Sequence, residues 1–151
     1  MKPKAIIVDI DSTILYHTNR GPFDWSDVSG DKIIPQMDKL LDLLHCSDEF
    51  DIFLVSGRPE STRDVTQEYL LDKDVTYNKL FLKQGNPYGK SVEHKEKTLL
   101  IIQETHDVFM AFEDDLVCAE MYKSHGIFTL VPINYAIKKT KKDDGQGKLF
   151  D

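Results

Sequence analysis

The chain has 151 residues, enough for one domain with a single core, and its 40% hydrophobic and 30% charged residues are typical of a folded, water-soluble protein. No apolar stretch approaches the roughly 18 residues that cross a bilayer. The net charge of −7 argues against a broad non-specific nucleic-acid surface but is compatible with binding one phosphate or one strand end. Cys46 and Cys118 lack metal-type spacing and fit reduced structural thiols, and the N-terminus leads directly into a predicted strand, so we expect a cytoplasmic protein.

The first predicted strand ends in two carboxylates. Ala5–Val8 is uniformly apolar, as expected for a strand buried on both faces in a parallel sheet. Asp9 and Asp11 follow it, and alternate residues of an extended chain point to the same side, so the two carboxylates should converge. Two like charges held close together are costly unless a cation or a shared proton relieves them. The pair therefore suggests Mg²⁺ and phosphoryl chemistry.

Predicted strands and helices alternate along the rest of the chain. A polar loop occupies 15–31, and we then expect helices at about 36–45, 60–72, 91–105 and 116–124 and strands at 51–55, 80–82, 108–112 and 127–131. This order predicts a three-layer α/β/α Rossmann-like domain over 1–137, with a central parallel sheet and right-handed crossovers. From residue 138 the composition becomes strongly polar, which predicts a flexible charged tail over 138–151.

Three of the predicted strands end in polar groups. Besides the aspartate pair, Ser56-Gly57-Arg58 ends the second strand and Glu113-Asp114-Asp115 ends the fourth. Parallel strands place their carboxyl ends at one edge of the sheet, so these groups should meet there. The helix before the fourth strand offers three lysines for the same edge, namely Lys90, Lys95 and Lys97. Each piece alone is also compatible with an ordinary turn, a solvated helix start or a surface charge, but the ordered set is far more specific than its parts.

The chain resembles the haloacid-dehalogenase-like (HAD) superfamily of phosphotransferases. The matching motifs are Asp9-Ile10-Asp11-Ser12-Thr13, Ser56, a downstream lysine and Glu113-Asp114, in the order of the superfamily. Within it the chain is most similar to the 3′-phosphatase domain of bacteriophage polynucleotide kinases, over about Lys4 to Val131. Further matches to that domain are Arg20-Gly21-Pro22-Phe23-Asp24, Val55-Ser56-Gly57-Arg58 and Glu120-Met121-Tyr122.

The resemblance implies a mechanism for particular residues. Asp9 would be the nucleophile that forms an aspartyl-phosphate, and Asp11 would protonate the leaving oxygen and later deprotonate the attacking water. Mg²⁺ would be held by the Asp9 carboxylate, the Asp11 backbone carbonyl and Asp114, with Glu113 as a further candidate ligand. The other implied substrate-binding residues are Ser56, Gly57, Arg58, Arg20 and Lys95, with Lys90 as the rival lysine. For either arginine we expect replacement by lysine to lower activity with little loss of stability.

The sequence departs from the family pattern at several positions. Ser12 stands where many relatives have glycine, which should be tolerated unless the turn requires a positive φ. Glu113 replaces a first aspartate and Asp115 replaces a basic residue, so the choice of metal ligands among the acids stays open. Asn86 stands near a functional aspartate of the phage enzymes, so substrate handling there can differ.

The connections between the strands leave no room for a separate cap domain. An uncapped site suits a bulky substrate, and the resemblance implies a 3′-phosphorylated DNA or RNA end. Phe23 and Trp25 could stack on a terminal base or simply pack the loop. The alternatives are a capless HAD phosphatase that acts on nucleotides or phosphoproteins, and a non-enzymatic adaptor with a degenerate fold. The adaptor is disfavoured because both Asp9 and Asp11 are retained, and a dehalogenase is disfavoured because it needs no acid at the second position.

The remaining motifs bear on further activities and partners of the chain. The chain has no Gly-x-x-x-x-Gly-Lys-Ser/Thr loop, so the sequence predicts a phosphatase without a kinase activity. None of the five histidines shows ligand spacing, and none is assigned a role. The segment Gln146–Phe150 resembles the short peptides that dock on a bacterial-type sliding clamp, which makes such a clamp a candidate partner.

Overall fold

A computed structural model describes residues 1–132 of the chain. In this range a five-stranded, fully parallel sheet has the strand order β5-β4-β1-β6-β7, and a two-stranded antiparallel sheet pairs β2 with β3. The strands are β1 (Lys4–Val8), β2 (Leu15–Tyr16), β3 (Lys32–Ile33), β4 (Phe50–Pro59), β5 (Lys79–Lys83), β6 (Asp107–Phe112) and β7 (Phe128–Leu130). The helices are α1 (Pro35–Cys46), a 3₁₀ turn (Glu60–Thr62), α2 (Arg63–Asp72), α3 (Ser91–Gln103) and α4 (Leu116–Ser124).

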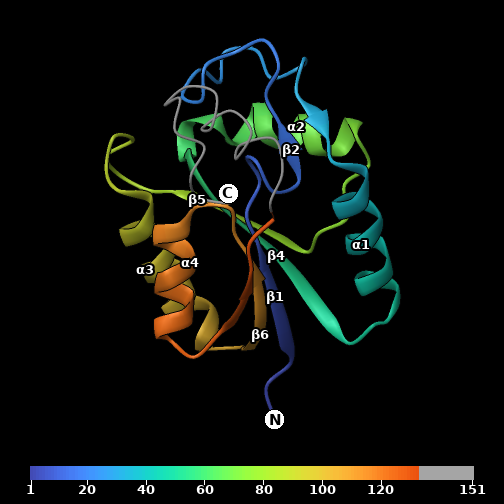
Figure 1. The fold of residues 1–151 in the computed structure, drawn as a ribbon, viewed down its shortest axis with the longest axis vertical. Helices are drawn as coiled ribbons and strands as arrows, with labels where there is room; N and C mark the ends of the chain where they lie inside the picture. Colours follow the sequence, from blue (N-terminus) through green and yellow to red (C-terminus); the bar gives the residue numbers. More distant parts are fainter. Residues whose placement is uncertain (133–151) are drawn as a thin grey trace, which may run out of the picture.

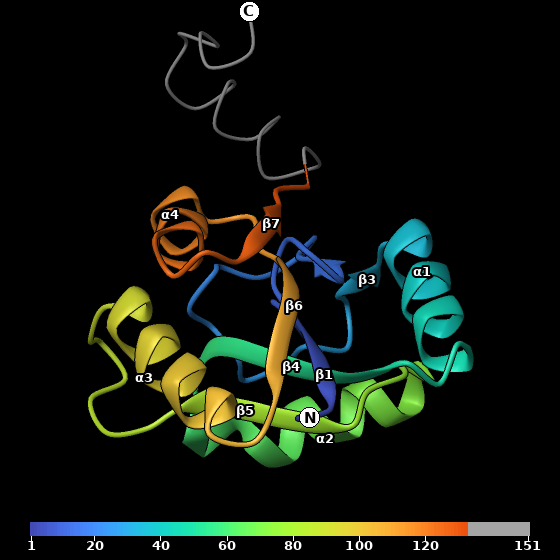
Figure 2. The ribbon, with the colours of Figure 1, turned by 90° about the horizontal axis from the view of Figure 1, so that it is seen from below.

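Two apolar cores lie on opposite faces of the sheet, as the alternation within β1 requires. Ile6 and Val8 belong to the core under α1 and α2, whereas Ala5 and Ile7 belong to the core under α3 and α4. Figure 2 shows α3 and α4 together on one side of the sheet and α1 and α2 on the other. Because every residue of β1 after Lys4 is buried in one of the two cores, β1 is fixed in register, and with it the start of the loop that carries Asp9.

The predicted three-layer α/β/α fold is confirmed, including the absence of a large cap domain from the described residues. The long connection after β1 arches over the carboxyl edge of the sheet, opposite the N-terminus (Figure 1). It was predicted as a loop over 15–31, but it contains β2 and leads into β3, whose pairing joins Leu15 to Ile33. Strands of two residues carry no periodicity that a sequence pattern could reveal, which explains the omission.

Strand β4, which follows β1 as the next strand of the main sheet along the chain, is longer than the sequence indicates. It was expected over 51–55, with Ser56-Gly57-Arg58 as a turn, but β4 continues to Pro59. Its pairing with β5 shifts in register between Val55 and Pro59, where the strand passes the polar residues. The candidate site therefore rests on a sheet strand at this point, which makes it more rigid than a surface turn.

Several expectations concern the surface and the chain ends. Both cysteines are free thiols, Cys118 buried as expected of a structural residue but Cys46 exposed. Among residues 1–132 no helix combines the length and the apolar character that a membrane crossing requires. The predicted boundary at 137/138, the charged tail and the clamp-like segment Gln146–Phe150 lie outside the described residues.

Candidate active site

Asp9 is the buried centre of the site and is contacted by Lys95 and Thr13. Its side chain is only 7% exposed, and its Oδ1 lies 2.9 Å from Nζ of Lys95 on α3. Thr13, in the turn after β1, directs its hydroxyl towards Oδ2 of Asp9 at 3.3 Å. The same hydroxyl lies 3.4 Å from Oδ1 of Asp114, beyond the end of β6. The structure thus brings together residues far apart in sequence, as the shared carboxyl edge of the sheet predicts.

Lys95, and not Lys90, reaches the carboxylates. Its Nζ lies 2.6 Å from Oε2 of Glu113 as well as close to Asp9. Burial alone would lower the pKa of Lys95, but the two carboxylates outweigh burial and raise that pKa well above its ordinary value. The lysine is therefore a fixed positive charge. Lys90 precedes α3 as its N-terminal flanking residue, is exposed, and contacts neither acid.

The acids after β6 differ in how much of their bonding capacity is used. Oε1 of Glu113 accepts from the backbone N–H of Asp115 and Oε2 from Lys95, so both oxygens are occupied. Burial and the charge of Asp9 raise the pKa of Glu113 to about 7. For Asp114 the same two causes, burial and Asp9, raise the pKa to about 10. Asp115 plays a different part, since its side chain accepts from Val117 N and Cys118 N and caps α4.

These carboxylates fit a hard divalent cation. Oxygens of Asp9, Glu113 and Asp114 lie within 4.8 Å of one another, and carboxylate oxygen is the donor that Mg²⁺ prefers. The raised pKa of Asp114 reflects burial and then the negative charge of Asp9, and a bound cation would relieve this crowding of charge. Glu113 uses both of its oxygens and Asp9 contacts both Lys95 and Thr13, so Asp114 retains the most bonding capacity for a cation. A second acidic group, which includes Asp11, is instead neutralised by arginines.

Asp11 is held by an arginine fork from β4. Nε and Nη2 of Arg58 lie 2.9 and 2.8 Å from the two carboxylate oxygens of Asp11, and Nε2 of His17 lies 2.7 Å from Oδ1. Burial alone would raise the pKa of Asp11, but the hydrogen bonds from Arg58 and His17 outweigh it and hold that pKa well below its ordinary value. The fork fixes the direction of the carboxylate.

Arg20 completes this network through a buried acid in the loop. Its Nε and Nη2 lie 2.9 and 2.7 Å from the two oxygens of Asp31, and Nη2 also lies 3.4 Å from Asp11. Asp31 is 3% exposed and Arg58 is 1% exposed. Tyr69 on α2 donates its hydroxyl to the backbone oxygen of Asp31 at 2.8 Å. Both arginines are therefore structural ion-pair partners as well as the predicted substrate-binding groups.

Ser56 and Gly57 join β4 to the start of α3. Ser56 is fully buried, and its Oγ accepts from the backbone N–H of Arg58 at 3.1 Å. Its backbone oxygen lies 3.0 Å from Nε2 of His94. A Cβ added to Gly57 would lie 2.6 Å from Oγ of Ser91, so the glycine allows α3 to begin directly against the strand. This close approach places Lys95, one turn further along the helix, over Asp9.

The turn after Asp11 requires an unusual backbone conformation. Ser12 has φ of 64°, in the left-handed region that favours glycine. The turn therefore does require a positive φ, so serine is strained at this position where many relatives have glycine. The backbone N–H of Ser12 donates to Leu15 O at 2.7 Å, which ties the turn to β2.

The structure adds residues that sequence reasoning missed. His17 and His94 were assigned no role, yet each bonds to a predicted site residue, and Asp31 was treated as part of a polar loop. Lys83 was also missed, although it ends β5 at the same sheet edge, and the rule that identified Asp9 could have found it. Phe23 and Trp25 do pack edge to face at 6.1 Å, but Phe23 remains 81% exposed.

The fold and this acidic edge define a HAD-like phosphotransferase domain. The family model of the polynucleotide kinase PNKP phosphatase domain matches residues 3–134, and the chain belongs to this family. A solved structure titled "Structure of the Pnkp1/Rnl/Hen1 RNA repair complex" superposes with a TM-score of 0.80 at 23% identity, covering 87% of this chain and 42% of that one. A second, titled "Structure of Pnkp1/Rnl/Hen1 complex", gives 0.81 at 23% identity, covering 87% and 46%. The chain thus spans less than half the length of either protein.

Proposed function

We propose that this chain is a Mg²⁺-dependent phosphomonoesterase that removes 3′-phosphate from DNA or RNA ends through an aspartyl-phosphate. The observation that carries the proposal is the environment of Asp9, a buried carboxylate that contacts Lys95 and lies two residues before Asp11. Membership of the phosphatase-domain family supports the reaction class. One of the two similar structures is titled as an RNA repair complex, which supports a nucleic-acid substrate.

In this mechanism an Asp9 oxygen attacks the phosphorus and the bond to the leaving oxygen breaks. Asp11 donates a proton to that oxygen, then accepts a proton from the water that attacks the aspartyl-phosphate and releases inorganic phosphate. Lys95 offsets negative charge throughout both steps. Asp9 and Asp114 would hold Mg²⁺ with the Asp11 backbone carbonyl, and the cation would neutralise phosphoryl oxygens. Ser56, Gly57 and the two arginines are the proposed phosphate-binding groups.

The substrate phosphate and Asp11 would share the same donors. Arg58 directs two nitrogens at Asp11, and a phosphate that takes up part of this fork would weaken the hold on the carboxylate. Asp11 would then carry a proton more readily, as an acid catalyst must. The arginine would thereby serve both substrate binding and the release of the catalytic acid.

A second candidate is a phosphatase of the same fold that acts on nucleotides or phosphoproteins. It is favoured by the absence of a cap domain from the described residues, which leaves the site open to several kinds of bulky substrate. The chemistry at Asp9 would be unchanged, so only a comparison of substrates separates the two candidates.

The test is release of inorganic phosphate by the full chain. Substrates are a 3′-phosphorylated DNA oligonucleotide, its RNA counterpart, the 5′-phosphorylated strands, nucleoside 3′-monophosphates and a phosphopeptide, each with Mg²⁺ and with EDTA. We expect the highest kcat/KM for 3′-phosphorylated strands and no turnover in EDTA. Preference for nucleotides or the peptide would support the second candidate, and full activity in EDTA would refute the metal requirement.

A further inference from the structure

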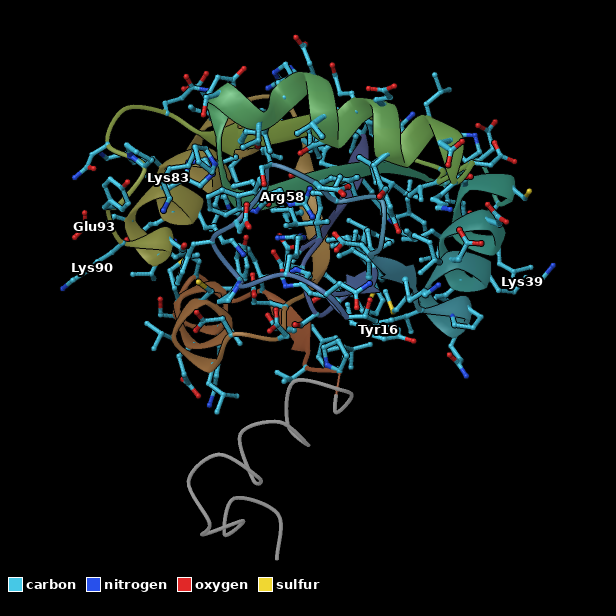
Figure 3. All side chains as sticks on the ribbon, turned by 90° about the horizontal axis from the view of Figure 1, so that it is seen from above. Tyr16, Lys39, Arg58, Lys83, Lys90 and Glu93 are labelled. Atoms are coloured by element: carbon cyan, nitrogen blue, oxygen red, sulfur yellow. The ribbon has the colours of Figure 1, made fainter. Side chains whose placement is uncertain are left out.

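A basic groove lies beside the candidate site, between the end of β5 and α3. It has a volume of about 530 Å³. Its polar lining includes Lys83, Gln84, Asn86, Lys90, His94 and Lys97. The groove starts close to the site, because His94 also bonds the backbone oxygen of Ser56 at 3.0 Å. Figure 3 shows Lys83, Lys90 and Glu93 gathered on the α3 side, with Lys39 far away beyond α1.

Among the carboxylates of the described residues, none pairs with a lysine of this groove. Within residues 1–132 no ion pair engages Lys83, Lys90 or Lys97, although the chain as a whole carries a net charge of −7. Glu93 is the one carboxylate in the lining. Arg63 also lines the groove, but it donates to the carboxylate of Glu60, which offsets its positive charge. The groove therefore combines three available cations with a single acid.

Lys83 is the least solvated of the three. It is 6% exposed, and its Nζ donates to the backbone oxygens of Gly89 at 2.7 Å and Pro87 at 3.4 Å. Burial and the nearby charge of Lys95 lower its pKa. An ammonium has three donors, and a buried cation without an anion is unfavourable. Binding of an anion in the groove would use the remaining donor and compensate the charge.

The cations are spaced along the helix in a way that suits a chain of phosphates. Lys90 immediately precedes α3 and Lys97 lies about two helical turns further on, so the two lysines are separated by about 10 Å along the helix axis. Contacts with both lysines would therefore involve more than one phosphate of a strand.

We infer that this groove binds the phosphodiester backbone of the substrate strand on the 5′ side of its terminal phosphate. The inference rests on the proposed function, since the terminal phosphate would lie at Asp9 and Ser56. It adds the direction in which the strand leaves the site, past His94 and along α3. It also explains how an acidic protein binds a polyanion, because the positive charge is confined to one groove.

The test compares a short and a long substrate. In the full chain, Lys90→Gln/Lys97→Gln is assayed on a 3′-phosphorylated decanucleotide and on a nucleoside 3′-monophosphate. We expect kcat/KM to fall about tenfold on the decanucleotide and less than twofold on the mononucleotide. The matched control is Lys39→Gln/Lys123→Gln, which removes two exposed helical lysines outside the groove and should change neither value. Lys97→Arg keeps the charge and should retain activity on the long substrate.

A binding measurement separates failure of this inference from failure of the proposed function. Fluorescence anisotropy with a 3′-hydroxyl decanucleotide needs no catalysis, and DNA and RNA versions are compared. The slope of log Kd against log salt should decrease by about 1.4 in Lys90→Gln/Lys97→Gln, as expected for two lost contacts with a single strand. If both double variants lost the same amount of binding affinity, or if neither lost any, the inference that this groove binds the strand would be refuted. Binding that depends on the groove lysines, combined with no phosphate release from any substrate, would refute the phosphatase and leave the groove supported.

Discussion

Lys95 Nζ lies 2.9 Å from Asp9 Oδ1 across 86 residues of sequence, and both side chains are less than a tenth exposed. A buried charge whose partner is removed is strongly destabilising. The contact therefore links the stability of the domain to its proposed chemistry, because the lysine that pairs with buried Asp9 in the fold also offsets negative charge in the proposed mechanism.

The first prediction concerns Asp9, the proposed nucleophile. Asp9→Asn should lower phosphate release by at least a thousandfold, because an amide cannot form the aspartyl-phosphate. The near-isosteric change should preserve the circular dichroism spectrum and cooperative unfolding. Asp107→Asn is the matched control, since this exposed aspartate begins β6 at the opposite end of the strand from the site. Near-normal turnover by Asp9→Asn would refute the mechanism.

The second prediction separates the two candidate lysines. Lys95→Met should lower both activity and the free energy of unfolding, the latter by about 3 kcal/mol, because Asp9 and Glu113 both lose their cation. Adding Glu113→Gln should recover part of the stability, which chemical denaturation would measure. Lys90→Met alters an exposed residue and should change the free energy of unfolding by less than about 0.5 kcal/mol. Equal destabilisation by the two lysine variants would contradict the assignment.

The third prediction corrects an expectation from sequence about the arginines. Arg58→Lys should lower activity about tenfold or more and should also lower stability by about 2 kcal/mol, because the lost fork holds Asp11 and the side chain is 1% exposed. Kinetics and thermal unfolding are measured together. Arg63→Lys, in a partly exposed pair with Glu60, is the control and should affect both little. An Arg58→Lys protein of unchanged stability would restore the sequence-based expectation.

The fourth prediction concerns the left-handed residue after Asp11. Ser12→Gly should raise the free energy of unfolding by up to about 1 kcal/mol, because φ of 64° is strained for serine but not for glycine. Ser61→Gly, in the 3₁₀ turn Glu60–Thr62, lies where φ is not positive and should instead destabilise. If both variants lost stability in chemical denaturation, strain at Ser12 would be excluded as a factor.

The fifth prediction concerns pH. Burial lowers the pKa of His94 from 6.5 to about 4, although the bond to Ser56 O opposes this effect. Between these values the unfolded chain binds a proton that the folded chain does not, so stability should fall as pH decreases from 6.5 to 4. His94→Gln should show a flatter dependence of melting temperature on pH over this window. Parallel curves for the two proteins would assign the pH dependence to other groups.

The sequence was most informative about polar residues that directly follow a predicted strand, because the topology of a parallel sheet brings such residues together at one edge. An apolar run followed by Asp9 and Asp11 predicts a buried strand and a carboxylate pair at its end. The sequence also favoured Lys95 over Lys90 as the lysine of the site. The close approach of α3 to Gly57, which places Lys95 beside Asp9, could not be predicted. Periodicity carries no information about such a contact.

The remaining parts of the site depend on pairings that sequence patterns do not encode. Asp31 lies in a segment whose flanking strands are only two residues long. His17 contacts Asp11 only because β2 pairs with β3 and folds the chain back over the sheet edge. The histidines lacked ligand spacing because their partners are a carboxylate and a backbone oxygen, so a search for metal motifs could not find them.

The order of strands in the main sheet has a consequence for how the protein acquires its chemistry during folding. Asp9 and Lys95 are separated by 86 residues and Asp11 and Arg58 by 47. The second pair can meet only when β1 has paired with β4, and the first only when α3 has also packed onto the sheet. Contacts of such long sequence separation form late and slowly, since the entropy of loop closure opposes them. A partly folded chain with native helices but an incomplete sheet would therefore lack the Asp9–Lys95 and Asp11–Arg58 contacts of the candidate site. Recovery of catalysis after dilution from denaturant would report completion of the central sheet, whereas recovery of helical signal would not.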